Sequence, residues 1–138
     1  MLLRRRIDTP ESLAGTALAT AVPAAELETV MRRGTIVDVS ADAALINEDT
    51  FGREFLVILA GQVEVSRDAT VVATLGAGDI VGEIALLENT RRNATVVARS
   101  DAQVLAFNRR EFVTVLDECP AFAAFVIATA EARQVAAA

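Results

Sequence analysis

The stretch GEIALLENTRRNATV, residues 82–96, opens as an almost continuous apolar run, yet it carries a glutamate at its second position and an arginine pair near its end. A charged side chain that becomes buried needs a partner. Glu83 and Arg92 could therefore pair with each other, or they could bind something that is not part of the chain. The remaining residues of the stretch favour the second possibility.

Each residue type in this stretch suits one part of an anionic ligand. Gly82 has no Cβ, so the backbone can approach a ligand closely. Residues 84–87 do not alternate in polarity, so we expect a short helical turn whose first N–H groups form an anion site. Arg92 would add a planar guanidinium that binds two phosphate oxygens, whereas Glu83, an acceptor only, suits a ribose 2′-OH. A phosphate beside a free ribose hydroxyl describes a nucleotide.

The composition argues against several other classes of protein. The net charge is −6 and the thirteen basic residues are all arginine, without a basic stripe, so we expect no direct binding of nucleic acid. No apolar run reaches the roughly 18 residues that cross a bilayer, so no membrane insertion is expected. The first ten residues, MLLRRRIDTP, lack the apolar region of a secretory signal. A cytoplasmic location is therefore expected.

Histidine is absent, which removes the commonest catalytic and metal-binding groups. A Ser-His-Asp triad, an imidazole base and a histidine-ligated metal are all excluded. A carboxylate-only site is possible in principle, but nothing at a suitable spacing supports one, so we expect no metal and no enzyme. Cys119 is the single cysteine, and its neighbours Asp117 and Glu118 would raise its pKa, so we interpret it as a small buried residue.

Helical patterns precede a region of strand patterns. Thr9 followed by proline predicts a helix start, and the alanine-rich helix that follows should break near residues 22–23. A second helix should run to about Arg33 and end at Gly34. From residue 35 to residue 108 the chain consists of short β-branched or apolar runs separated by turn residues. These runs are TIVDV (35–39), ALI (44–46), FLVIL (55–59), QVEV (62–65), TVVATL (70–75), ATVVA (94–98) and AQVLAF (102–107).

Two helices should follow the strands. Asn108 and Glu111 have the spacing of a capping box, and Pro120 opens a last helix with an apolar side. We therefore predict a mainly β fold with flanking α-helices, built around a jelly-roll-like β-barrel. The expected single domain spans residues 1–138. Its parts are N-terminal helices over about 9–34, the barrel over 35–108 with the special stretch at 82–96, and C-terminal helices over 108–135.

Residues 82–96 resemble the phosphate-binding cassette of the cyclic nucleotide-binding domain, as found in catabolite-activator-type regulators, protein kinase A regulatory subunits and cyclic nucleotide-gated channels. The family pattern is Gly-Glu-aliphatic-Ala-Leu-aliphatic, four variable residues, then Arg-x-Ala-Thr-Val. It falls without a gap on Gly82 to Leu87, Arg92 and Ala94 to Val96. The hairpin FLVILAGQVEV (55–65) and the approach LGAGD (75–79) match the family as well.

The resemblance implies a ligand, cAMP or cGMP, and a role for each matching residue. Glu83 should accept from the ribose 2′-OH and Arg92 should hold the cyclic phosphate. Asn93 stands where relatives often carry Ala, Ser or Thr, so the nucleotide is left open, with cAMP favoured by its frequency in the family. The expected ligand-binding residues are Gly82, Glu83, Ile84, Ala85, Arg92, Asn93 and Ala94, with the backbone N–H groups of Ile84, Ala85 and Ala94 completing the phosphate site.

Three positions depart from the family pattern. Asp42 and Asp49 replace turn glycines, which aspartate tolerates better than most residues. Val81 replaces an aromatic residue. Because the chain has neither Trp nor Tyr, any cap over the base would come from Phe122 or Phe125 in the last helix. For both phenylalanines, packing in the core is favoured over a role as a base cap.

We therefore expect a sensor that signals through its C-terminal helices. These helices would act as a lid or hinge, and they would contact Leu86 or Leu87. Its partners would be a cyclic nucleotide and either a second copy of the chain or an effector domain in the same or another chain. The main alternative is a degenerate domain that binds no nucleotide and serves as a structural or dimerisation module. A cupin-like enzyme is disfavoured by the absence of histidine, and a transcription factor by the absence of a helix-turn-helix pattern.

Overall fold

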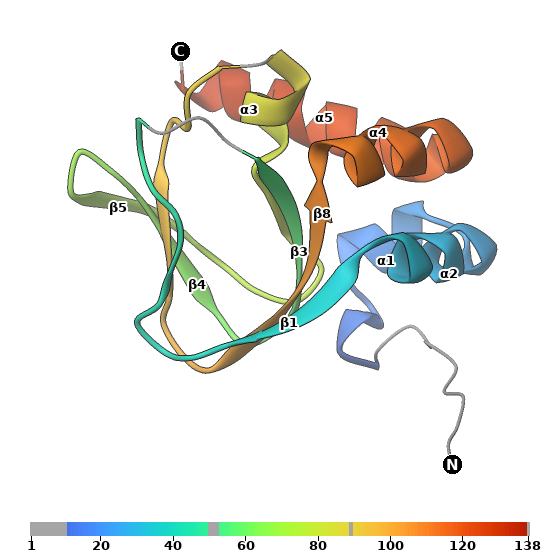
Figure 1. Cartoon of the computed structure of the whole chain (residues 1–138), viewed down its shortest axis with the longest axis horizontal. Coiled ribbons are helices and arrows are strands. Elements are labelled where there is room, and N and C mark those ends of the chain that lie inside the picture. Colours follow the sequence, from blue (N-terminus) through green and yellow to red (C-terminus); the bar gives the residue numbers. More distant parts are fainter. Residues whose placement is uncertain (1–10, 50–52, 89, 138) are drawn as a thin grey trace.

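The computed structural model describes residues 11–49, 53–88 and 90–137, with side chains to Gln134, as two four-stranded antiparallel sheets flanked by helices (Figure 1). One sheet has the order β1-β8-β3-β6 and the other β2-β7-β4-β5. The strands are β1 (Thr35–Val39), β2 (Ala44–Ile46), β3 (Glu54–Ala60), β4 (Val63–Arg67), β5 (Thr70–Leu75), β6 (Ile80–Val81), β7 (Thr95–Ala98) and β8 (Ala102–Asn108). The helices are α1 (Ala17–Ala21), α2 (Ala24–Arg33), α3 (Glu83–Glu88), α4 (Arg109–Glu118) and α5 (Pro120–Ala137), preceded by a 3₁₀ turn at Glu11–Leu13.

Strand β3 lies at the centre of the protein, between the two apolar clusters. Five consecutive residues of β3, 55–59, are buried. Because side chains alternate across a strand, Phe55 and Leu59 face the helices while Leu56 and Ile58 face the other sheet. This double burial explains why FLVIL does not alternate in polarity.

The N-terminal helices differ in one detail from the sequence expectation. The expected cap Thr9 and the proline after it lie outside the described residues. Within them, the alanine-rich segment is divided at Gly15, whose φ is +79°, and α1 begins behind the cap Thr16. Helix α2 ends at Arg33 before Gly34, as predicted.

The C-terminal helices pack on the outer face of the sheet that contains β3 (Figure 1). The predicted capping box is present: Asn108 accepts from the Glu111 N–H at 2.8 Å, and the Glu111 carboxylate accepts from the Asn108 N–H at 2.9 Å. The Glu26 carboxylate of α2 accepts from the backbone N–H groups of Ala121 and Phe122 at 3.2 and 2.9 Å. Helix α2 therefore anchors the start of α5, where a carboxylate is favoured by the helix dipole.

The predicted fold class, a mainly β jelly roll with flanking helices, is confirmed. The seven predicted strands are present, and the structure adds the two-residue strand β6, which is too short for a periodic pattern. Asp42 and Asp49 have φ of +74° and +68°, so both adopt the left-handed conformation that the family's turn glycines suggested. The single-domain organisation over residues 1–138 stays a prediction.

The described part of the chain has no single helix that is long and apolar enough to span a membrane. Helix α4 and the part of α5 as far as Gln134 are long and apolar enough only when counted together, and the two are bent by 119° at the break between them. Such a bent pair is weak evidence for a membrane span.

Candidate functional site

A pocket of about 370 Å³ lies between α3 and the sheet β2-β7-β4-β5, and one residue of α5 reaches its wall. Strands β4 and β5 supply an apolar side, and the loop from β6 into α3 supplies the other. The lining residues are Ile46, Val65, Arg67, Val72, Ala73, Leu75, Val81, Gly82, Glu83, Ile84, Ala85, Arg92, Asn93, Ala94, Val96 and Arg133. The seven ligand-binding residues expected from the sequence are all among them.

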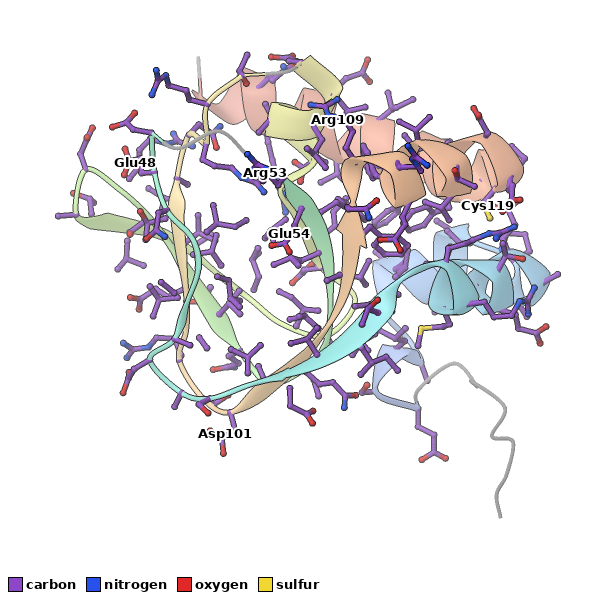
Figure 2. All side chains as sticks on the ribbon, viewed as in Figure 1. Glu48, Arg53, Glu54, Asp101, Arg109 and Cys119 are labelled. Carbon is purple, nitrogen blue, oxygen red and sulfur yellow. The ribbon has the colours of Figure 1, made fainter. Side chains whose placement is uncertain are left out.

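Arg92 is buried and is oriented by backbone carbonyls. Its Nη1 donates to the Gly82 carbonyl at 3.2 Å and its Nη2 to the Glu54 carbonyl. Figure 2 labels Glu54, at the start of β3. Burial lowers the pKa of Arg92, and the nearby carboxylates of Glu54 and Glu83 oppose this shift. Because a guanidinium has five N–H donors, the two carbonyl bonds orient Arg92 and leave donors for an anion.

Gly82 is required by this orientation of Arg92. Its φ is +91°, a conformation that residues with a Cβ rarely adopt. An added Cβ would also lie 2.6 Å from Arg92 Nη1 and 2.7 Å from the Glu54 carbonyl oxygen. The close approach of a ligand to Gly82 stays a prediction, and the structure adds that the guanidinium of Arg92 approaches this glycine closely.

Glu83 is buried at 1% exposure, and its ionic partner is Arg133 of α5. Arg133 Nη1 lies 2.8 Å from Glu83 Oε1 and 2.9 Å from Oε2. Among the described residues, no ion pair or hydrogen bond joins Glu83 to Arg92. The idea that these two residues satisfy each other is therefore wrong: each has a different partner, and both line the same pocket.

The predicted helical turn is present as α3, and it links the pocket to the C-terminal helices. Leu86 is buried in the cluster that contains Phe112 and Val126, whereas Leu87 is 40% exposed. Of the two leucines, Leu86 therefore makes the expected contact. Arg109, labelled in Figure 2, donates from Nη1 to the Leu86 carbonyl at 3.1 Å, which ties the end of α3 to the start of α4.

The two phenylalanines considered as a base cap do not reach the pocket. Phe122 has 0% exposure and packs against Phe55 at a ring distance of 6.1 Å, and Phe125 is partly buried against the same cluster. In this conformation neither side chain lines the pocket and both pack in the core cluster, so a base cap from either residue stays a prediction. Arg133, more than two helical turns beyond them, is the residue of α5 that lines the pocket.

Comparison with known proteins identifies this arrangement. A model of the cyclic nucleotide-binding domain matches residues 36–119, more than half of the chain. The chain belongs to the cyclic nucleotide-binding domain family. In this family the domain is regulatory rather than catalytic.

Relatives of the domain belong to several signalling systems. The Pycsar effector protein PaPycTIR of Pseudomonas aeruginosa is 39% identical over 88 residues, which cover 63% of this chain and 29% of that protein. A Drosophila melanogaster cGMP-dependent protein kinase is 34% identical over 80 residues, covering 58% of this chain and 7% of the kinase. The solved structure of PKAR CBD2 with Sp-2Cl-cAMPS bound has a TM-score of 0.71 at 27% identity and covers 78% of this chain and 74% of that one. The chain therefore spans less than a third of the length of the two curated relatives.

Sequence reasoning missed two arginines in this cyclic nucleotide-binding domain. Arg67, at the end of β4, lines the pocket and donates from Nε to the Asn93 carbonyl at 3.0 Å. Arg133 could have been found from helix periodicity, because it lies seven residues after the buried Val126 and three after the buried Ala130. An arginine on the apolar face of a helix needs an acidic partner, and that requirement points to a buried carboxylate.

Proposed function

We propose that this domain is a sensor that binds a cyclic nucleotide in the pocket beside α3 and signals through its C-terminal helices. One observation carries the proposal: Glu83 and Arg92 are the charged side chains that are buried among the described residues, and both line the pocket. A buried acceptor and a buried cationic donor on one wall suit a ligand with a hydroxyl and an anionic group.

The phosphate would bind at Arg92. Its remaining N–H donors form charge-assisted bonds to phosphate oxygens, each contributing roughly 1.5–3 kcal/mol. Ile84 and Ala85 lie in the first turn of α3, where N–H groups have no acceptor within the helix, and both line the pocket together with Ala94. The ribose 2′-OH would donate to Glu83. The base would then face the apolar side chains of β4 and β5, beside Arg67 and Asn93.

Cyclic AMP is the proposed ligand, with cGMP as the alternative. The similarity to PKAR CBD2 with a cAMP analogue supports the first, and the similarity to a cGMP-dependent kinase supports the second. The exposed Asn93 lines the pocket and presents both a donor and an acceptor, so it suits either purine.

Signal transmission would run from α3 to α5. Leu86 packs among the residues of α4 and α5, and the Glu83–Arg133 pair joins the first residue of α3 to the last part of α5. A ligand that binds Glu83 and Arg92 can shift α5 only if the domain binds that ligand more tightly with α5 in one position than with α5 in another. The receiver would be an effector domain in the same or another chain, or a second copy of this chain.

The first test is a calorimetric titration of the protein after unfolding, dialysis and refolding to remove bound ligand. With neither Trp nor Tyr in the chain, a co-purified purine would dominate the ultraviolet spectrum before this step. We expect saturable binding of cAMP, and a change in hydrogen exchange along α5 when it binds. If none of the cyclic nucleotides of adenine, guanine, cytosine or uracil binds the refolded protein, the domain is a structural module.

A further inference from the structure

Arg67 is a charged residue on the otherwise apolar side of the pocket. It is the last residue of β4, and it lines the pocket together with Val65, two residues earlier on the same strand. Its Nε donates to the Asn93 carbonyl at 3.0 Å. Asn93 directly follows Arg92, the proposed phosphate ligand, so this hydrogen bond orients the guanidinium of Arg67 beside the binding stretch.

The bond to Asn93 leaves the outer edge of the Arg67 guanidinium available. Among the described residues, the N–H groups on its Nη1 and Nη2 have no hydrogen-bond acceptor. A guanidinium offers donors and no acceptor, and its two terminal nitrogens each direct one N–H the same way. Together these two N–H groups form a planar fork that matches a pair of adjacent acceptor atoms on a ligand.

Purine bases differ in how well they match such a fork. Guanine presents O6 and N7 side by side, and both are acceptors, whereas adenine presents N7 beside an amino group that donates. The fork therefore forms two hydrogen bonds with guanine, but with adenine one of its N–H groups meets another donor. A nucleotide with its phosphate on Arg92 and its ribose on Glu83 would direct its base towards β4 and β5, where Arg67 lies.

From this arrangement we propose that Arg67 contacts the base of the ligand and favours a 6-oxo purine, such as guanine, over a 6-amino purine, such as adenine. The inference rests on the proposed function and deepens it, because it names a residue that influences the choice between cAMP and cGMP. It concerns the contribution of one side chain: Arg67 raises the affinity for cGMP relative to cAMP, and the other pocket residues add their own preferences.

The test is a calorimetric titration of the wild type and Arg67→Ala with cAMP, cGMP and cIMP. Cyclic IMP has the O6 and N7 acceptors of guanine but lacks its 2-amino group, so it isolates the edge that the fork would bind. Loss of the fork should lower the affinities for cGMP and cIMP, relative to that for cAMP, by about five- to tenfold. This is the lower part of the range for a bidentate base contact, because Arg67 is partly exposed.

Arg99→Ala is the matched control. Arg99 also pairs with a residue of β4, Glu64, but it does not line the pocket. Its removal changes the net charge by the same amount as the removal of Arg67. The affinities for all three nucleotides should therefore stay as in the wild type, and far-UV circular dichroism should show that both variants are folded.

Each outcome decides the matter. A similar fall for cGMP and cIMP, with cAMP bound about as tightly as before, supports base recognition by Arg67. An equal loss for all three overturns it, because Arg67 would then contact the phosphate or ribose, or only position Asn93. A loss confined to cGMP, unchanged affinities, or a wild type that binds cAMP alone also overturns it. All these results leave the proposed function intact, whereas a wild type that binds no cyclic nucleotide of any base overturns both proposals.

Discussion

Replacing Gly82 by alanine tests how Arg92 is held. The φ of +91° places Gly82 where an L-residue costs about 1–2 kcal/mol. The new Cβ would also lie 2.6 Å from Arg92 Nη1 and 2.7 Å from the Glu54 carbonyl oxygen. The guanidinium can move, but the carbonyl belongs to β3, and overpacking of this kind costs about 1–3 kcal/mol more. We therefore expect the free energy of unfolding to fall by about 2–5 kcal/mol in total.

The matched control is Gly15→Ala. Gly15 has a similar φ of +79°, but no atom lies within 4 Å of a Cβ added there, so only the backbone strain of about 1–2 kcal/mol applies. Urea unfolding followed by far-UV circular dichroism measures both variants, and the midpoints should fall at unchanged m-values. Gly82→Ala should also weaken nucleotide binding, because it displaces Arg92, whereas Gly15→Ala should not. Equal midpoint shifts with equal affinities would refute this account of the Arg92 position.

Three further predictions concern a buried leucine, a helix cap and a buried thiol. Leu86→Ala should lower the free energy of unfolding by about 2–5 kcal/mol and weaken the response of α5 to ligand, whereas the same change at the 40% exposed Leu87 should do neither; equal effects would contradict the assigned contact. Asn108→Ala should cost about 1 kcal/mol by removing the capping box before α4, as measured by urea unfolding; no change in the midpoint would contradict it. Burial, together with Glu26, raises the pKa of the Cys119 thiol, so iodoacetamide at pH 8 should label Cys119 much more slowly in native than in unfolded protein. Equal labelling rates would contradict this burial.

The same shift has a consequence for stability at high pH. Because the folded-state pKa of Cys119 is raised above its unfolded value, its contribution to stability is fully present below the unfolded pKa and is lost as the pH rises through the folded pKa. The sequence indicated the direction of this shift from Asp117 and Glu118. Burial is the largest cause of the raised pKa, followed by Glu26 and then Glu118.

The parts of the fold that could be predicted from the sequence are those specified by local patterns. The run TVVATL coincides with β5, and the spacing of Asn108 and Glu111 located the start of α4. The missed features have weak local patterns: β6 has only two residues, and the break at Gly15 interrupts a segment whose alanines favour helix. Tertiary contacts decide such short elements.

The candidate site likewise has one part that a local sequence pattern specifies and another part that only tertiary contacts determine. Its contiguous part, from Gly82 to Ala94, could be located because one stretch of sequence carries both charges and the glycine. The partner of Glu83 could not be located, because Arg133 is distant in the sequence and meets Glu83 only when α5 packs across α3. Helix periodicity places Arg133 on the apolar face of α5, but only the three-dimensional arrangement shows which carboxylate it reaches.

The most direct test of the central claim compares two adjacent arginines. Arg92 is buried in the pocket wall, while Arg91 is exposed and donates to the Asp49 carbonyl at 3.0 Å. In a calorimetric titration of the ligand-free protein with cAMP, Arg92→Ala should lose about 2–5 kcal/mol of binding free energy, as expected when one partner of a buried charge pair is removed, and Arg91→Ala should bind like the wild type. Equal affinities of the wild type and a folded Arg92→Ala protein would contradict the claim that Arg92 binds the phosphate of a cyclic nucleotide.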